Sequence, residues 1–146
     1  MAEIKIKLLS KTAKIPLQNF TDPAGADLYA DIDHAVDVLP HTTEVIGTGI
    51  AVAIPKGYFG AIAPRSGLAT KQGLRPANCI GIIDADYRGE IAVAMHNDTD
   101  VIRTIEPFDR IAQLIIVPYL PVTFVPVDDL DETERGTGGF GSTGSK

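Results

Sequence analysis

The sequence predicts an all-β domain of the sandwich, barrel or jelly-roll type. Apolar and polar residues alternate with a period of two in several short runs, and proline, glycine, asparagine or aspartate stands between the runs. Many short strands with frequent turns are typical of these architectures. The chain has 146 residues, which fits one domain of ordinary size.

Each strand is predicted from its own pattern. At the N-terminus, Ile4, Ile6 and Leu8 alternate with lysines, which is typical of a strand with one face in water. A later run is rich in β-branched residues and ends at Pro55, and the long apolar run before Pro118 reads as a buried strand. The predicted strands cover residues 4–8, 45–54, 58–63, 91–95, 111–117 and 122–125.

We predict a single short helix. Ser66 is a suitable N-cap, residues 68–72 would form one or two turns, and Gly73 would end them. The N–H groups at such a helix start, with Arg65 beside them, would favour an anion such as phosphate. The alternative for the same residues is an ordinary capped helix with an arginine in solvent.

Composition excludes several classes of function. A formal net charge of −6 is a poor basis for non-specific binding of nucleic acid, and no apolar run is long enough for a membrane span. A single cysteine, Cys79, excludes an internal disulfide framework and a multi-cysteine zinc site, and favours a cytoplasmic location, with nucleus and organelles left open. The histidines His34, His41 and His96 lack the spacing of a metal site.

The C-terminal segment changes character after residue 127. An acidic run over residues 128–134 precedes Arg135 and a glycine-rich stretch, and composition alone favours a disordered tail. Residues 136–141 match GxGxxG formally, but no strand precedes them and no helix follows, so a dinucleotide site is rejected. Phe140 among the glycines, with Arg135 before it and Ser142 and Thr143 beyond it, argues against a tail that is merely solvated, and glycine-rich backbone can approach phosphates closely.

Two further segments carry carboxylates. Residues 81–90 place Asp84, Asp86, Tyr87 and Arg88 at the tip of an expected β-hairpin, where a carboxylate is either plain surface or a general base. Asp27 lies among small residues. It is either a carboxylate at a strand edge or an oxygen ligand of the kind that Mg²⁺ uses, often through water.

Five segments of the chain resemble, in their sequence order, the five motifs of the trimeric dUTPase family, the dUTP diphosphatases. The resemblance extends over nearly the whole chain. The segments are residues 24–30 (AGADLYA), 64–69 (PRSGLA), 81–89 (GIIDADYRG), 109–113 (DRIAQ) and 135–144 (RGTGGFGSTG).

The resemblance implies a fold, an assembly and a reaction. The fold would be a jelly-roll β-barrel, the dUTPase-like β-clip, spanning residues 1–127, followed by an acidic linker and mobile lid over residues 128–146. Three subunits would form a homotrimer and share each active site. With Mg²⁺, water would attack the α-phosphorus of dUTP, yielding dUMP and pyrophosphate. This reaction limits uracil incorporation into DNA and supplies dUMP for thymidylate synthesis.

The resemblance also implies roles for individual residues. Asp84 would be the general base, Asp27 would hold Mg²⁺ through water, Tyr87 would pack on the deoxyribose and Phe140 would stack on uracil. The residues that would bind substrate are Arg65, Ser66, Gly67, Asn78, Gly81, Ile83, Asp84, Tyr87, Gln113, Arg135, Phe140, Gly141, Ser142 and Thr143.

Three positions depart from the usual family pattern. Phe108 stands where glycine is expected, and Cys79 and Ile80 replace the commoner Ser-Pro beside the uracil hairpin. Two other functions remain open. One is deamination of dCTP on the same fold, and the other is a non-catalytic regulatory role. The 81–87 segment and the tail with its phenylalanine favour the diphosphatase over the deaminase, and the intact Asp84 argues against a catalytically dead protein.

Overall fold

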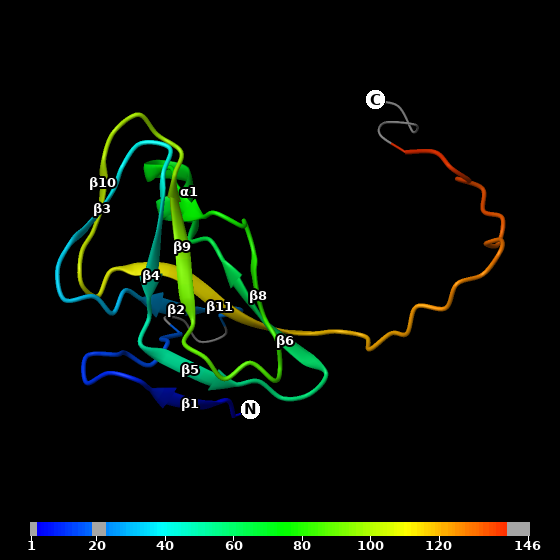
Figure 1. Cartoon of the computed structure of the whole chain (residues 1–146), viewed down its shortest axis with the longest axis horizontal. Coiled ribbons are helices and arrows are strands. Elements are labelled where there is room, and N and C mark those ends of the chain that lie inside the picture. Colours follow the sequence, from blue (N-terminus) through cyan, green and yellow to red (C-terminus); the bar gives the residue numbers. More distant parts are fainter. Residues whose placement is uncertain (1–2, 19–22, 140–146) are drawn as a thin grey trace.

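A computed structural model describes residues 3–18 and 23–139 of the chain (Figure 1). Eleven strands and one short helix are found in this part, which confirms the all-β class. The elements are β1 (Lys5–Leu8), β2 (Ala26–Tyr29), β3 (Val36–Val38), β4 (Thr43–Gly47), β5 (Ile50–Ala53), β6 (Tyr58–Ala63), α1 (Ser66–Gln72), β7 (Leu74–Pro76), β8 (Gly81–Ile83), β9 (Ala92–Asn97), β10 (Arg103–Ile105) and β11 (Arg110–Pro118).

The strands form small antiparallel sheets in non-sequential order. One sheet has the order β2-β11-β6-β8, a second has the order β4-β9-β7, and two pairs are β1-β5 and β10-β3. This order, with strands distant in sequence side by side, is that of a jelly roll. Strand pairing among the described residues does not close the sheets into a continuous barrel. Side-chain packing and single backbone hydrogen bonds between sheets, such as Ile91 N–H to Ile50 O at 2.8 Å, hold the body together.

One apolar core lies between the sheets. On β9 and just before it, Ile91, Val93 and Met95 are at most 2 % exposed, as their alternation predicts. Each fully buried side chain of this size contributes about 1.5–3 kcal/mol relative to an exposed one. Six further Leu and Ile side chains from other strands are at most 2 % exposed: Leu28, Ile46, Ile50, Leu74, Ile105 and Ile111.

The expected single strand over residues 45–54 is wrong. The run is divided into β4 and β5, which belong to different sheets. Between them Gly49 has φ +65°, a left-handed conformation that favours glycine, and a Cβ there would collide with the Asp31 carboxylate. The apolar pattern continues through the turn because both halves face the same core.

The prediction of a strand over residues 122–125 is also wrong. In the described part of the chain, the last strand, β11, ends at Pro118. Tyr119 makes the last backbone contact with the body, donating its N–H to Gly57 O at 3.0 Å. The arm, residues 120–139, then runs away from the body (Figure 1). Leu120 is 80 % and Phe124 92 % exposed. A strand needs a partner for its backbone groups, and this apolar segment pairs with no strand among residues 3–18 and 23–139.

The helix agrees with the prediction at one end only. Gly73 has φ +62° and donates its N–H to Leu68 O, so it ends the helix as expected. Ser66 is not the N-cap. It is the first helical residue, and the N-cap is Arg65, whose backbone is extended and which makes no side-chain capping bond. The helix begins directly after β6 and Pro64, and Arg65 turns its side chain toward β2 instead.

Candidate active site

A polar cavity of about 400 Å³ lies where three distant segments meet. Strand β11 is central, because it pairs with β2 on one side and with β6 on the other. Gln113 on β11 therefore lies opposite Asp27 on β2 and opposite Ala63 on β6. Ala63 precedes Arg65 by two residues. The lining residues are Pro23, Ala24, Gly25, Asp27, Arg65, Ser66, Gly67, Arg110 and Gln113, which include five residues expected at the site from sequence.

The charged centre of this cavity is Asp27 with two arginines. Its side chain is 11 % exposed, and it accepts from Arg65 Nε at 2.9 Å and from Arg110 Nη1 at 3.2 Å. Arg65 also donates from Nη1 to the carbonyl of Arg110 at 3.2 Å. Two guanidinium groups beside one carboxylate leave a net positive charge, which suits a polyanionic ligand.

A β-bulge explains how Arg110 reaches this position. The register between β11 and β2 shifts between Arg110 and Ala112, so Arg110 lies opposite Tyr29. The shift turns Arg110 onto the face of Asp27, while Ile111 remains 1 % exposed in the core. Sequence reasoning placed Arg110 in a motif but not in the site, because a bulge leaves no clear pattern in the sequence.

Gln113 is fixed by contacts on both ends of its amide. Nε2 donates to Pro64 O at 2.9 Å. A Cβ on Gly25 would come within 2.6 Å of Oε1, so the close approach of β2 requires glycine there. The amide is thus held at the wall of the cavity with little freedom to rotate.

A second region lies along the free edge of β8. This strand pairs with β6, whereas β9 pairs with β4 and β7, so residues 84–90 are a loop between two sheets and not the tip of a paired hairpin as expected. Two adjacent hollows of about 210 and 250 Å³ share Ile82, Ile83 and Ala92. Asp84, Tyr87 and Glu90 line one, and Asn78, Gly81 and Val45 line the other. Because β8 is an edge strand, its outer backbone groups are open to a planar polar ligand.

The loop after β8 is held by its own polar contacts. Tyr87 donates its hydroxyl to Glu90 O at 2.9 Å and its N–H to Asp84 O at 3.1 Å. A Cβ on Gly89 would collide with the Tyr87 ring, so glycine lets the ring lie across the loop. Glu90 in turn accepts from Gly49 N–H at 2.9 Å and ties the loop to the β4–β5 turn. The Asp84 side chain remains exposed beside Tyr87.

Comparison with known proteins identifies the family to which this fold belongs. A family model described as dUTPase matches residues 11–144. The chain belongs to the dUTPase family. It is 47 % identical to the deoxyuridine 5'-triphosphate nucleotidohydrolase of Syntrophotalea carbinolica, over 97 % of this chain and 96 % of that protein. The corresponding protein of Corynebacterium glutamicum is 46 % identical, over 99 % and 96 %.

Solved dUTPase structures share the fold. A point mutant of the Staphylococcus bacteriophage 80alpha dUTPase with dUpNHpp superposes with a TM-score of 0.90 at 32 % identity, covering 99 % of both chains. A mutant dUTPase from phage phi11 of S. aureus, described with a structural Mg(II) ion, gives a TM-score of 0.77 at 29 % identity, covering 88 % of this chain and 98 % of that one.

The site residues expected from the dUTPase resemblance fall into two separate groups within one chain. Asp27, Arg65, Ser66, Gly67 and Gln113 line the cationic cavity. Asn78, Gly81, Ile83, Asp84 and Tyr87 line the two hollows at β8. In the part of the chain that the structure describes, the cationic cavity shares no lining residue with the two hollows at β8.

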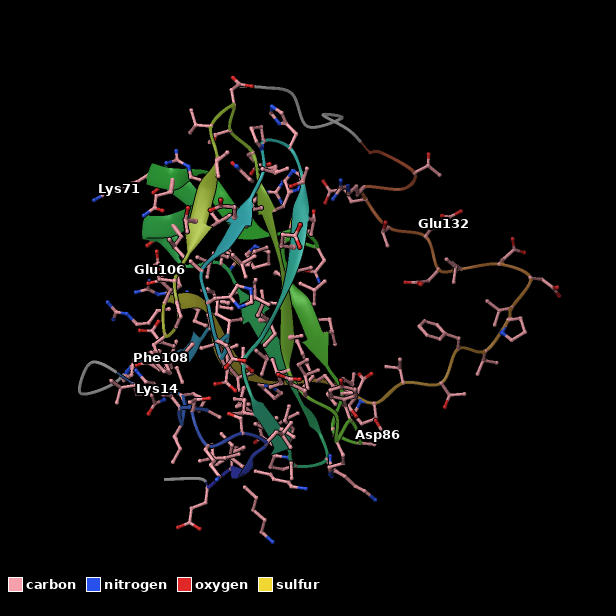
Figure 2. The ribbon with its side chains drawn as sticks, turned by 60° about the vertical axis from the view of Figure 1, so that its left-hand side comes forward. Lys14, Lys71, Asp86, Glu106, Phe108 and Glu132 are labelled. Carbon is pink, nitrogen blue, oxygen red and sulfur yellow. The ribbon has the colours of Figure 1, made fainter. Side chains whose placement is uncertain are left out.

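Of the expected lid residues, the structure describes Arg135 alone. Arg135 is on the arm, where Nε donates to Gly138 O at 2.8 Å. Glu132, also on the arm, lies well away from the body (Figure 2). Phe140, Gly141, Ser142 and Thr143 lie outside the described residues, so their roles stay predictions.

The donor set for a metal is small. Within residues 3–18 and 23–139, no group of three or more His, Cys, Asp or Glu side chains could hold an ion. Among the described residues, Asp27 is the single carboxylate lining the cationic cavity, and both its oxygens accept from arginines. This arrangement fits Mg²⁺ held mainly by substrate phosphates and water, with Asp27 contacting a bound water.

Within residues 3–18 and 23–139, no helix is long and apolar enough to cross a membrane.

Phe108 keeps the turn that glycine was expected to form. Its φ is +69°, a strained conformation for a bulky residue. The Lys14 ammonium lies 4.2 Å from the centre of its ring and 5.2 Å from that of Tyr29, and Figure 2 shows Lys14 beside Phe108. This cation–π contact offsets part of the strain.

Proposed function

We propose that this member of the dUTPase family hydrolyses dUTP to dUMP and pyrophosphate by attack of water on the α-phosphorus. The observation that carries the proposal is the presence of two complementary half-sites in one chain. One is a fixed cationic cavity that suits a triphosphate, and the other is an open strand edge with a carboxylate and a tyrosine beside it. The first half-site suits the triphosphate of a pyrimidine deoxynucleotide, and the second suits its base and sugar.

The cationic cavity would hold the phosphate chain. Arg65, kept in orientation by Asp27, presents its guanidinium to the cavity, and Ser66 and Gln113 add polar contacts. Mg²⁺, when bound with the triphosphate, neutralises charge on the phosphates and on the leaving pyrophosphate. Asp27 would contact this ion through water. In phosphoryl transfer such positioning and charge neutralisation supply most of the rate enhancement.

The edge of β8 would receive uracil. Its outward N–H and C=O groups, with Asn78 and Gly81, can pair with the polar edge of the base. Cytosine presents the opposite pattern of donors and acceptors and would leave buried groups unpaired, which permits discrimination of about 10⁴–10⁵. Tyr87, anchored by Glu90 O, would pack on the deoxyribose and exclude a 2′-hydroxyl.

Asp84 is proposed as the general base. Its exposed carboxylate lies beside Tyr87, at the sugar end of the uracil hollow. It would accept a proton from the attacking water as the water oxygen bonds to the α-phosphorus. The bond from that phosphorus to the bridging oxygen then breaks, and pyrophosphate leaves with the electron pair.

A homotrimer is part of the proposal. Within one chain the two half-sites line separate cavities, and the arm exposes Leu120, Val122, Phe124 and Val125. Contact between copies would bring unlike half-sites together and cover this apolar surface. Residues 128–134 would then act as a linker, and Arg135, Phe140, Gly141, Ser142 and Thr143 as a lid donated to a neighbouring site. We place the enzyme in the cytoplasm, where the exposed thiol of Cys79 stays reduced.

The test is pyrophosphate release from dUTP, dCTP, dTTP, dATP, dGTP and UTP, with Mg²⁺ and with EDTA. We expect release from dUTP alone, and only with Mg²⁺. Ammonia from dCTP without turnover of dUTP would identify a deaminase instead. Tight binding of dUTP without any turnover would favour a regulatory protein.

A further inference from the structure

The side chain of Arg75 lies between two loops that are distant in sequence. It projects from β7, and its Nε and Nη2 donate to the two carboxylate oxygens of Asp98 at 2.6 and 2.9 Å. Its third nitrogen, Nη1, points the other way. It donates to Pro76 O at 3.1 Å and Ala77 O at 3.4 Å, and lies 3.8 Å from the sulfur of Cys79. One guanidinium thus connects Asp98 to the turn over residues 76–79.

The Asp98 side of this contact is firmly anchored. Its N–H donates to Gly73 O at 2.8 Å. The preceding residue, Asn97, is fully buried and donates to Val38 O and Val101 O, while its own oxygen accepts from Thr99. His96 Nε2 lies 3.5 Å from the Asp98 carboxylate. The hydrogen bond from Arg75 lowers the pKa of Asp98, so the pair is charged at neutral pH.

The turn on the other side needs external support. Cys79 has φ +61°, an uncommon conformation for a residue with a side chain, and residues 77–80 are exposed. Cys79 N–H donates to Pro76 O at 3.1 Å, and Ala77 N–H donates to Ala94 O at 2.7 Å. Pro76 O therefore accepts both the turn's own hydrogen bond and one from Arg75. Asn78, at the centre of this turn, lines the hollow assigned above to uracil.

We propose that Arg75, fixed by Asp98, is a positioning residue that sets base recognition by holding the turn that carries Asn78. This inference rests on the proposed function, because that function assigns the hollow beside β8 to uracil. A bidentate arginine–carboxylate pair fixes the plane of the guanidinium and therefore the orientation of its remaining N–H groups. In this plane Nη1 points at the carbonyl oxygens of Pro76 and Ala77 in the turn. Lysine would keep the charge but could not bind Asp98 and the turn together.

The first measurement needs no nucleotide. Hydrogen exchange of the amides in residues 77–80 is compared for wild type, Arg75→Lys and Asp98→Asn. Asp100→Asn is the matched control, because Asp100 lies in the same loop and pairs with His41 at 2.9 Å but does not touch the turn. We expect exchange to rise roughly tenfold in the first two variants and to stay at the wild-type rate in the control. Unchanged exchange in both variants would overturn the claim that Arg75, fixed by Asp98, braces the turn over residues 76–79.

The second measurement is steady-state kinetics with dUTP and dCTP. We expect KM for dUTP to rise by roughly ten- to a hundredfold in Arg75→Lys and Asp98→Asn, with kcat within about twofold. The preference for dUTP over dCTP should fall as well, while Asp100→Asn keeps wild-type values. The double variant should be no worse than either single one, because both remove the same contact. A loss of kcat at unchanged KM and base preference would overturn the inference.

The two measurements also separate this inference from the proposed function. If wild type releases no pyrophosphate from dUTP, the proposed function fails and base recognition by the turn fails with it, although the exchange rates still report the brace. If wild type turns over dUTP but the variants show altered exchange and unchanged base preference, the proposed function stands and the positioning role of Arg75 is wrong.

Discussion

Asp27 Oδ1 accepts from Arg65 Nε at 2.9 Å, which joins a strand near the N-terminus to the start of the helix 38 residues later. The guanidinium is only partly exposed, so its direction is set by the carboxylate before any ligand arrives. A cation held in this way loses little conformational freedom on binding phosphate. This contact gives Asp27 a structural role in addition to any role near Mg²⁺.

Asp27→Asn should weaken catalysis by loosening Arg65 and Arg110. We expect kcat/KM for dUTP to fall roughly a hundredfold and the free energy of unfolding to fall by about 1–3 kcal/mol. Urea unfolding and steady-state kinetics measure the two effects. Asp37→Asn is a control, because that carboxylate is exposed and accepts from Thr104 across the β10–β3 pair, away from the cavity. Wild-type kinetics in Asp27→Asn would remove this carboxylate from the site.

Asp84→Asn should separate binding from chemistry. The amide keeps the size of the side chain but cannot take the proton from water, so kcat should fall roughly 10²–10⁴-fold. Affinity for dUpNHpp, measured by calorimetry, should stay close to wild type. Asp86→Asn, two residues later on the same exposed loop, serves as control. If Asp84→Asn turns over dUTP at nearly the wild-type rate, another group is the base.

Gly89→Ala should move Tyr87. The new Cβ would collide with the phenol ring, which must shift and give up its bond to Glu90 O. We expect selection of dUTP over UTP to fall by roughly ten- to a hundredfold, since a misplaced ring no longer fills the space of a 2′-hydroxyl. Tyr87→Phe removes only the hydroxyl and should cost less. Equal selection in Gly89→Ala and wild type would contradict the role given to Tyr87.

Removal of residues 135–146 should cost activity without changing assembly. The proposed lid carries Arg135 and Phe140, so kcat should fall at least a hundredfold, while sedimentation still gives a trimer. Ending the chain after Pro118 also removes the exposed apolar arm and should yield smaller species. Full activity after removal of residues 135–146 would refute the lid. A trimer formed by the chain that ends at Pro118 would refute the role of the arm in assembly.

The Arg75–Asp98 pair should make stability depend on pH in the acid range. Hydrogen bonding from Arg75 holds the pKa of Asp98 below its ordinary value, with His96 and His41 adding to the effect. A carboxyl with a lowered pKa in the folded state stabilises the fold above its unfolded pKa, and this stabilisation is lost as pH falls through the folded value. The difference in unfolding free energy between wild type and Asp98→Asn should be constant above about pH 5 and shrink below about pH 4. A difference that grows on acidification would contradict this assignment.

The sequence by itself determined the local elements. The alternation at Ile91, Val93 and Met95 predicted β9, and Gly73 predicted the end of the helix, because a strand's period and a left-handed residue are properties of a few neighbours. The five motifs and their order indicated the family and ten of the residues that line the two half-sites.

Only the tertiary structure decided which of these elements meet. It divided residues 45–54 between two sheets, separated β8 from β9, and left residues 122–125 without a partner. It also turned Arg110 toward Asp27 by a bulge and joined Arg75 to Asp98. These contacts depend on strand register and on chain segments 23 to 83 residues apart. A register is fixed by the burial of whole faces against the core, and no short stretch of sequence contains that information.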